Sequence, residues 1–249
     1  MTSLSTQETK NTQEANQSKH LGLPHLSPNT QYVTSSFKLG IIAGGQLGKM
    51  LALAASNWDV ATYILDNDPA CPASSCCTQQ TLGDPKNFDD VYTFGKSVDL
   101  LTYEIESINI EALLALKKDG KSIHPDPDIL QVIQDKGTQK EFYTHHQIPT
   151  APYFLVEGTQ EITQALQSGK LHYPFVQKLR KGGYDGRGVS VIKNANDLNL
   201  LLTGPSVIES LVSIQAEISV LAARNSQGQI RCFPTVSYTH LTLPTNREV

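Results

Sequence analysis

A glycine-rich segment that follows basic residues is the part of this sequence best suited to bind phosphate. The segment reads QKLRKGGYDGRG over residues 177–188, with four glycines among its last seven positions. Such a loop can fold its backbone amides around phosphate oxygens, and Lys178 would add a positive charge. Asp185 and Arg187 lie inside the loop, where they could contact a second substrate. The alternative is a solvated hairpin turn, but the glycine spacing and flanking cations favour a phosphate loop.

Two glutamates beyond that loop could hold a nucleoside. Glu209 ends a β-rich run, and Glu217 follows eight residues later on the next predicted strand. Beside a phosphate loop, acids at strand ends suit hydrogen bonds to an adenine amino group and to ribose hydroxyls. Exposed acids of a hairpin are the alternative interpretation.

A second glycine-rich turn lies near residue 45. In IIAGGQLGKM, Ala43, Gly45 and Gly48 have the G-x-G-x-x-G spacing, with alanine in the first place. Gly45 lets the backbone approach a ligand, and the amino end of the following helix attracts anions. The pattern is compatible with a dinucleotide site, a phosphate site or a turn without a ligand. Asp66, 18 residues after Gly48, could bind a ribose, although an ordinary loop acid is the favoured interpretation.

The elements before residue 124 alternate between strand and helix. Apolar runs at 39–43, 60–65 and 98–103 predict buried strands. The apolar positions 47, 50, 51, 54 and 55 predict one face of a helix. This alternation predicts a parallel sheet, which binds ligands at the carboxyl ends of its strands. The residues expected at that edge are Gly44, Gly45, Asp66 and Glu104.

The pattern changes after HPDPD at residues 124–128, and we place a domain boundary near residue 130. A helical stretch containing Lys136, Lys140 and Phe142 follows. Strands joined by tight connections then predict an antiparallel sheet, with one helix near 198–202. The predicted strands span residues 174–179, 189–193, 206–212, 216–223 and 230–233.

Four segments result from this organisation. Residues 1–36 are rich in Ser, Thr, Gln and Asn and predict a disordered polar extension. Residues 37–130 form the predicted parallel-sheet domain, and residues 131–236 form the second, α+β domain. Residues 237–249, SYTHLTLPTNREV, do not continue the strand pattern, and we expect them to be a foreign tail.

Composition and charge exclude several classes of protein. The 249 residues include 20 basic and 24 acidic side chains, and the net charge of −4 disfavours binding to nucleic acid or to membranes. No run approaches the roughly 18 apolar residues of a membrane span, and no secretory signal opens the chain, so we expect a cytoplasmic protein. The four cysteines lack C-x-x-C spacing, so neither disulfides nor a zinc site is predicted.

Six segments together resemble the 5-(carboxyamino)imidazole ribonucleotide synthases, ATP-grasp ligases also known as the ATPase subunit of phosphoribosylaminoimidazole carboxylase. They are GGQLGKM, LTYEIE, QDKGTQKEFY, IPTAP, GGYDGRG and IESLVSIQAEIS, and they lie within residues 37–236. The resemblance implies an α/β protein, in which a Rossmann-like parallel-sheet N-terminal domain precedes a truncated α+β ATP-grasp domain. It also implies carboxylation of aminoimidazole ribonucleotide by bicarbonate in purine biosynthesis, with ATP and Mg²⁺, by a homodimer.

The resemblance assigns roles to the residues that match the family's motifs. Those that would contact ATP are Lys136, Lys178, Gly183, Tyr184, Asp185, Gly186, Arg187, Gly188, Val189, Glu209, Ser210, Leu211, Val212 and Glu217. Those that would contact the imidazole ribonucleotide are Gly45, Gln46, Leu47, Glu104, Tyr184, Asp185 and Arg187. Of these, Asp185 and Arg187 would act in catalysis.

The sequence departs from the family pattern at two places. Family members commonly have glycine where Ala43 stands, which we expect to be a mild change. The sequence also stops before the half of the ATP-grasp fold that holds the family's metal-binding acids. We therefore predict no metal ligands and no activity for this chain by itself.

Three other functions compete with this one. Another ATP-grasp ligase, such as a formate-using glycinamide ribonucleotide transformylase, would have a loop richer in Ser and Lys than GGYDGRG. A non-catalytic nucleotide-binding module would fit the missing metal acids. A nicotinamide-dependent dehydrogenase is suggested by the first glycine turn alone.

Overall fold

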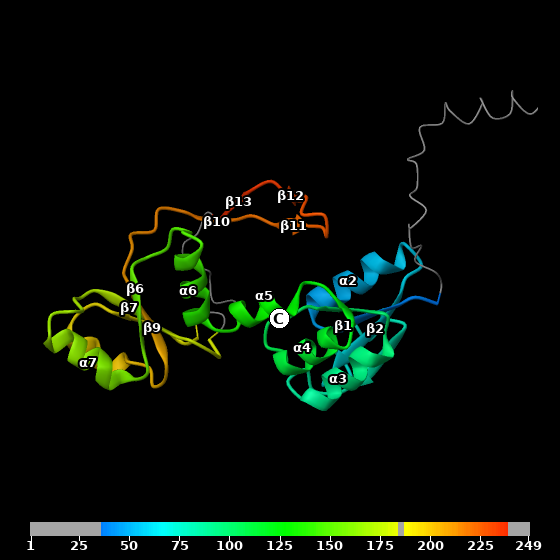
Figure 1. The fold of residues 1–249 in the computed structure, drawn as a ribbon, viewed down its shortest axis with the longest axis horizontal. Helices are drawn as coiled ribbons and strands as arrows, with labels where there is room; N and C mark the ends of the chain where they lie inside the picture. The colour runs from blue at the N-terminus through cyan, green and yellow to red at the C-terminus, as the bar shows by residue number, and fades with distance from the viewer. Residues whose placement is uncertain (1–35, 184–186, 239–249) are drawn as a thin grey trace, which may run out of the picture.

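The computed structural model of this protein describes residues 36–183 and 187–238. Two α/β units follow one another along the chain, and α5 (Pro127–Ile133) and α6 (Lys136–His145) lie between their sheets (Figure 1). The first sheet is parallel and the second antiparallel, which confirms the predicted fold class. The boundary near residue 130, the extension 1–36 and the tail 237–249 stay predictions, since the last two lie almost wholly outside the described residues.

The parallel sheet has the strand order β3-β2-β1-β4-β5. Strand β1 lies at its centre because Ile41 and Ile42, which point to opposite faces, can both be fully buried. Strands β3 and β5 were not predicted from the sequence. The strands are β1 (Lys38–Ile42), β2 (Ala61–Asp66), β3 (Gln79–Leu82), β4 (Leu100–Tyr103) and β5 (Ser122–Ile123).

Two helices, α3 (Phe88–Ser97) and α4 (Ile110–Lys118), cover one face of this sheet. Each follows an asparagine whose side chain accepts a backbone hydrogen bond, the usual chemistry of a helix start. Leu65 and Phe94 belong to the core between sheet and helices, whereas Ile64 packs with Cys71 and Ala73 on the opposite face. The sheet is therefore buried on both sides.

Helix α2 (Gln46–Ser56) buries a face other than its most apolar one. Its buried residues are Gly48 and Ala52, whereas Leu47 and Met50 are 55% and 56% exposed. The cause is a close contact at the end of β1, since a Cβ on Gly48 would lie 2.6 Å from the Ala43 carbonyl oxygen. The predicted helix is confirmed, but its face with small residues packs inward, and the apolar positions 47, 50, 51 and 54 are exposed.

The antiparallel sheet has the strand order β6-β9-β7-β8. Phe175, Ile208 and Ile162 lie in its core, and the partly buried Leu198 of the 3-10 helix η2 (Ala195–Leu200) packs against them. This short helix replaces the helix predicted at 198–202. Strand β6 and helix α7 (Thr159–Gln167) were not predicted from the sequence. The strands are β6 (Tyr153–Val156), β7 (Phe175–Leu179), β8 (Val189–Ile192) and β9 (Ser206–Ser210).

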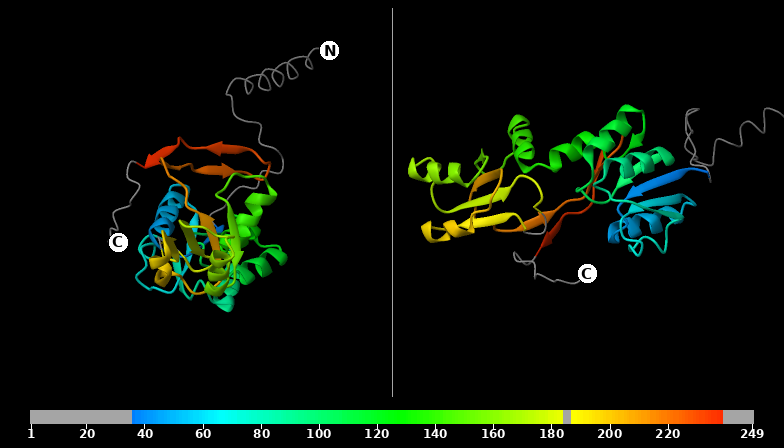
Figure 2. Two further views of the ribbon diagram at one scale, coloured as in Figure 1. Left: turned by 90° about the vertical axis from the view of Figure 1, so that its left-hand side faces the viewer. Right: turned by 90° about the horizontal axis from the view of Figure 1, so that it is seen from below.

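Four short strands after β9 form two separate antiparallel ribbons, which stand apart from the four-stranded sheet (Figure 2). Strand β10 (Glu217–Ser219) pairs with β13 (Val236–Tyr238), and β11 (Ala222–Arg224) pairs with β12 (Ile230–Cys232). The single strand predicted at 216–223 is thus two strands, and the strand predicted at 206–212 ends at residue 210. Strand β13 includes two residues of the predicted tail.

Candidate functional site

The first glycine turn lies at the carboxyl end of β1, as predicted. The Gly44 amide donates a hydrogen bond to Asp66 Oδ2 at 2.6 Å. A Cβ on Gly45 would lie 3.3 Å from both carboxylate oxygens of Glu104, which follows β4. The sheet edge therefore gathers the glycine turn, Asp66 and Glu104 next to the first residues of α2, Gln46 and Leu47.

Ala43 has a backbone conformation that an alanine adopts only with strain. Its φ of 72° lies in the left-handed region. A side chain with a Cβ costs roughly 1–2 kcal/mol in that region, whereas glycine adopts it freely. The expectation that alanine here is a mild change stays a prediction, and the left-handed φ gives it a specific cost.

Glu104 has surroundings that disfavour its charged form. Burial raises the pKa of Glu104 above its ordinary value, and the Asp66 and Glu106 carboxylates raise it further. A hydrogen bond from the Leu47 amide opposes this shift in pKa. Such a carboxyl can exchange a proton with a ligand, or accept a hydrogen bond from it, at the end of the sheet.

The glycine loop begins at the end of β7. The Leu179 amide donates to the Gly188 carbonyl at 2.8 Å and so closes the loop at its base. Gly188 has a φ of 72°, and a Cβ on Gly183 would lie 2.8 Å from the Arg187 carbonyl oxygen. Glycine is required at both positions for this backbone path. Tyr184, Asp185 and Gly186 lie outside the described residues.

Lys136 reaches the glycine loop from the first turn of α6. Its Nζ donates a hydrogen bond to the Gly183 carbonyl oxygen at 3.1 Å. Its backbone amide donates to the Arg180 carbonyl oxygen at 2.9 Å. Lys136, which was predicted to contact ATP, therefore contacts the loop both at its start and at Gly183.

Glu209 lies between two lysines. Lys140 Nζ is 2.9 Å from Glu209 Oε1, and Lys178 Nζ is 2.7 Å from Glu209 Oε2. Burial would raise the pKa of Glu209, but the hydrogen bonds from both lysines hold it below its ordinary value. Both oxygens of the carboxylate predicted to face adenine are therefore occupied by ammonium groups.

Lys140 was missed as a site residue. The available signal was its position four residues after Lys136, because residues four apart lie on the same side of a helix. The four-residue spacing places two cations of α6 toward the strands that carry Lys178 and Glu209. The structure brings Lys140, Lys178 and Glu209 into contact, and Lys136 contacts the glycine loop.

Of the remaining predicted ATP contacts, some adjoin Lys178 or Glu209 and one, Glu217, lies on another sheet. Val189 begins β8 and pairs with Lys178. Ser210, Leu211 and Val212 are exposed at and after the end of β9. Glu217 is exposed at the start of β10. Because β10 pairs with β13, Glu217 lies on a separate ribbon and not on the sheet that carries Glu209.

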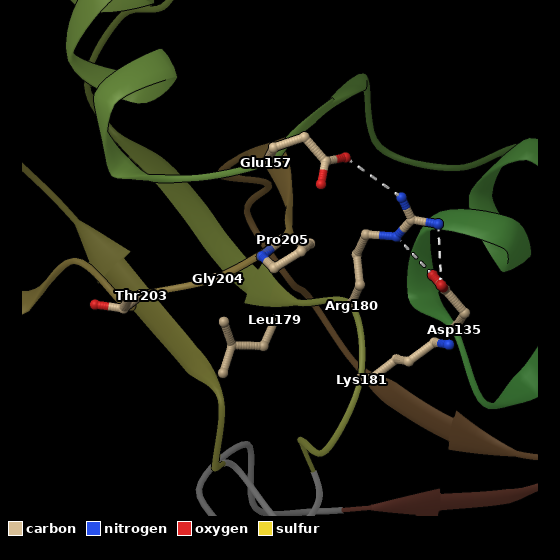
Figure 3. A pocket seen from close by; sticks show the side chains of 8 residues that line it. All are labelled: Asp135, Glu157, Leu179, Arg180, Lys181, Thr203, Gly204 and Pro205. Carbon is tan, nitrogen blue, oxygen red and sulfur yellow. Dashed lines mark hydrogen bonds and ion pairs between the residues drawn. The ribbon is translucent and has the colours of Figure 1, made fainter.

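A cavity of about 400 Å³ opens at the end of β7, beside the start of the glycine loop. Figure 3 shows the Arg180 side chain between Asp135 and Glu157, and the closer partner is Asp135. Among the described residues that line this cavity, none is a predicted ATP contact. Sequence reasoning missed the pairing of Asp135 with Arg180, since a charged pair far apart in sequence has no local signature.

The described ranges contain no group of three or more His, Cys, Asp or Glu side chains that could hold a metal ion. The four cysteines are free thiols. None of the described helices is long and apolar enough to cross a bilayer.

Comparison with known proteins follows the same division of the chain. Residues 37–134 match the ribonucleotide synthetase preATP-grasp domain, and residues 141–242 match the ATP-grasp domain. The N5-carboxyaminoimidazole ribonucleotide synthase of Bacillus subtilis is 32% identical over 206 residues, which are 81% of this chain and 53% of that protein. The crystal structure of N5-carboxyaminoimidazole ribonucleotide synthetase from Thermotoga maritima is 36% identical with a TM-score of 0.71, over 81% of this chain and 53% of that one. This chain belongs to the N5-carboxyaminoimidazole ribonucleotide synthase family. The resemblance seen in the sequence is confirmed.

One further member of this N5-carboxyaminoimidazole ribonucleotide synthase family was solved with ligands. The Aspergillus clavatus structure, in complex with ADP and 5-aminoimidazole ribonucleotide, is 26% identical with a TM-score of 0.72, over 82% of this chain and 54% of that chain. The present chain therefore spans about half the length of these relatives. The family's two domain types correspond to the parallel and antiparallel sheets described above.

Proposed function

We propose that this protein binds ATP and uses it to carboxylate 5-aminoimidazole ribonucleotide with bicarbonate, which gives 5-(carboxyamino)imidazole ribonucleotide for purine biosynthesis. The observation that carries the proposal is the pair of lysines at the glycine loop. Lys136 Nζ lies 3.1 Å from the Gly183 carbonyl oxygen, and Lys178 lies one residue before the end of β7. The names and ligands of the relatives support the choice of substrates.

The chemistry explains why phosphate binding is central. Bicarbonate is a poor electrophile, because its negative charge shields the carbon. Transfer of the γ-phosphoryl group from ATP to a bicarbonate oxygen gives carboxyphosphate and ADP. The substrate amine then forms a C–N bond to the carboxyl carbon, phosphate leaves with the electrons of the broken C–O bond, and the amine loses a proton. The protein contributes mainly positioning and charge neutralisation.

The second domain would hold ATP. Lys136, Lys178 and the loop would bind the phosphates, because cations and backbone amides both stabilise phosphate oxygens. Both Glu209 oxygens bind lysines, so backbone groups of residues 209–212 would supply the adenine hydrogen bonds. Glu217 would bind the ribose. Further ATP contacts would come from Gly183, Tyr184, Asp185, Gly186, Arg187, Gly188 and Val189.

The first domain would hold the imidazole ribonucleotide. The amino end of α2 presents the backbone amides of Gly45 and Gln46, which suit an anionic group, while the Leu47 amide holds the Glu104 carboxyl beside them. Glu104 lies next to this turn, where its carboxyl would accept a hydrogen bond from a nitrogen of the substrate. Tyr184, Asp185 and Arg187 would approach from the loop, with Asp185 and Arg187 in catalytic roles.

Mg²⁺ would accompany ATP, since divalent cations neutralise charge on the phosphates during phosphoryl transfer. The described residues offer no cluster of His, Cys, Asp or Glu side chains that could hold the ion. A cytoplasmic location is supported by the four free thiols, because reducing compartments keep cysteines unpaired.

A protein of the relatives' length would form a homodimer. The support is the apolar surface of α2, where Leu47, Met50 and Leu51 are exposed within the described part of the chain. Exposed apolar surface of this kind marks protein contacts. Sedimentation of a protein of the relatives' length should show twice the monomer mass, and a monomer at micromolar concentration would contradict this assignment.

Two matched variants test the proposed reaction in a protein of the relatives' length. Lys178→Met should raise the KM for ATP about tenfold or more through the loss of a charge-assisted phosphate contact, and change the KM for 5-aminoimidazole ribonucleotide little. Glu104→Gln should do the reverse. Lys96→Met removes an exposed lysine paired with Asp119 and serves as the control. The proposal fails if the wild type shows no ATP turnover dependent on the imidazole ribonucleotide, or if the Lys178 effect is confined to that substrate.

A further inference from the structure

The two lysines on Glu209 are held in different ways. The Lys140 side chain is only 11% exposed, donates a hydrogen bond to Thr150 Oγ1 and lies 5.6 Å from the centre of the Tyr153 ring. The Lys178 side chain is 33% exposed and lies one residue before the end of β7, where the glycine loop begins. Lys140 is therefore the fixed partner of Glu209, and Lys178 is the one that can turn toward a ligand.

The charges in this cluster sum to a single positive charge. Two ammonium groups and one carboxylate lie in contact, and the Glu209 side chain is only 7% exposed. When Lys178 turns toward a phosphate, Lys140 still neutralises the carboxylate that Lys178 has left. Without Lys140, the same movement would leave a buried negative charge unpaired, which is costly.

We propose that Lys140 is a charge-balancing residue that sets the affinity for ATP through Glu209 and Lys178, without touching the nucleotide. This inference rests on the proposed function, because it takes Lys178 as a ligand of the ATP phosphates. Lys140 frees the positive charge of Lys178 for ATP by neutralising the carboxylate beside it. The role makes α6 part of the nucleotide site at both Lys136 and Lys140.

The competing explanation is that Lys140 only ties α6 to β9 through its ion pair with Glu209. The two explanations differ in what happens when Glu209 is also neutral. If Lys140 balances charge, it matters only while Glu209 carries a charge. If it is only a structural tie, removing Glu209 as well cannot restore what was lost.

The experiment is a double-mutant cycle on ATP affinity, measured by calorimetric titration of a protein of the relatives' length. Lys140→Met should raise the Kd for ATP about tenfold, and Lys140→Gln, which keeps a hydrogen-bond donor without the charge, should do the same. Lys140→Arg should stay within about threefold of the wild type, because it keeps the charge. Glu209→Gln alone should stay within about threefold of the wild type, and adding Lys140→Met to it should change the Kd by less than about twofold. Lys96→Met, which removes a lysine paired with an acid on the exposed surface of the other domain, is the matched control.

Two results would overturn the inference. One is a Kd for ATP that stays within about twofold of wild type in both neutral variants. The other is a loss of affinity in Glu209→Gln alone as large as that in Lys140→Met, which would make the ion pair a structural tie. Thermal melting of each variant shows whether it is folded, and the Gln variant takes the place of the Met variant if the latter is not. Failure of the wild type to bind ATP would instead refute the proposed function.

Discussion

Arg180 binds Asp135 through two parallel hydrogen bonds, from Nε to Oδ1 at 2.8 Å and from Nη2 to Oδ2 at 2.9 Å. The same carboxylate accepts hydrogen bonds from the Gly137 and Thr138 amides, so it also caps the start of α6. A Cβ on Gly137 would lie 2.5 Å from Arg180 Nε, which explains the glycine. One carboxylate thus joins the first turn of α6 to the end of β7, where Lys136 and the glycine loop meet.

Replacement of Arg180 by lysine should lower the free energy of unfolding by about 1–3 kcal/mol. A lysine cannot make the two parallel bonds, and it would leave part of a largely buried carboxylate without a partner. Urea unfolding of the wild type and Arg180→Lys measures the difference. Lys117→Met is the control, because Lys117 pairs with Asp126 and Asp128 at the surface and should contribute little. A loss in the control as large as that in Arg180→Lys would contradict the prediction.

Stability should fall in acid through Asp135. Burial would raise the pKa of Asp135, but the Arg180 guanidinium and two backbone amides hold that pKa below its ordinary value. The folded state therefore binds this proton less readily than the unfolded chain. The resulting stabilisation is fully present above the unfolded pKa of about 4 and is lost as the pH falls through the lower pKa of the folded state.

Unfolding of the wild type and Asp135→Asn across this range tests the assignment. The difference in free energy of unfolding should be constant above about pH 5 and shrink toward lower pH. A difference that does not change with pH would show that another carboxyl causes the acid sensitivity.

Gly183→Ala should weaken ATP binding about tenfold or more while the melting temperature changes little. The new Cβ would lie 2.8 Å from the Arg187 carbonyl oxygen, so the loop must shift, whereas loops that cover ligands lie outside the cooperative core. Titration with ATP and thermal melting separate the two effects. Gly158→Ala is the matched control, since a Cβ there meets open space before α7. A parallel fall in stability and affinity would make the loop a packing element. We expect the same for Gly186, which lies outside the described residues.

Ala43→Gly should raise the free energy of unfolding by about 0.5–1 kcal/mol. Relief of the left-handed strain outweighs the extra freedom that glycine gives the unfolded chain. Ala54→Gly, at an exposed position within α2, should instead lose about 0.5–1 kcal/mol and is the control. Chemical denaturation of the two variants side by side decides the sign, and a loss in Ala43→Gly would refute the strain.

The parallel sheet could be predicted because its central strands are buried on both faces and therefore appear as continuous apolar runs, such as residues 39–43. The glycine loop could be located because its backbone path requires glycine at fixed positions, which are visible in the sequence. The buried face of α2 could not be predicted from apolar periodicity, because the close contact between Gly48 and Ala43 determines which face packs inward.

The surroundings of Glu209 were equally out of reach. Its position at a strand end is typical of an exposed acid that faces a ligand. Its burial between Lys140 and Lys178 arises only when β7 pairs with β9 and α6 packs beside them. Pairings between distant segments of this kind leave no trace in local spacing.

The strand orders also determine when each sheet can form during synthesis. In the parallel sheet, the central strand β1 is made first, and β2 and β4 are added on either side of it. In the antiparallel sheet, β9 lies between β6 and β7 and yet is the last of the four to leave the ribosome. The first sheet can therefore fold before the second has been made, because domains fold as units and the N-terminal one folds first during translation. The second sheet waits for residue 210, and Lys140 and Lys178 gain their shared carboxylate only at that point.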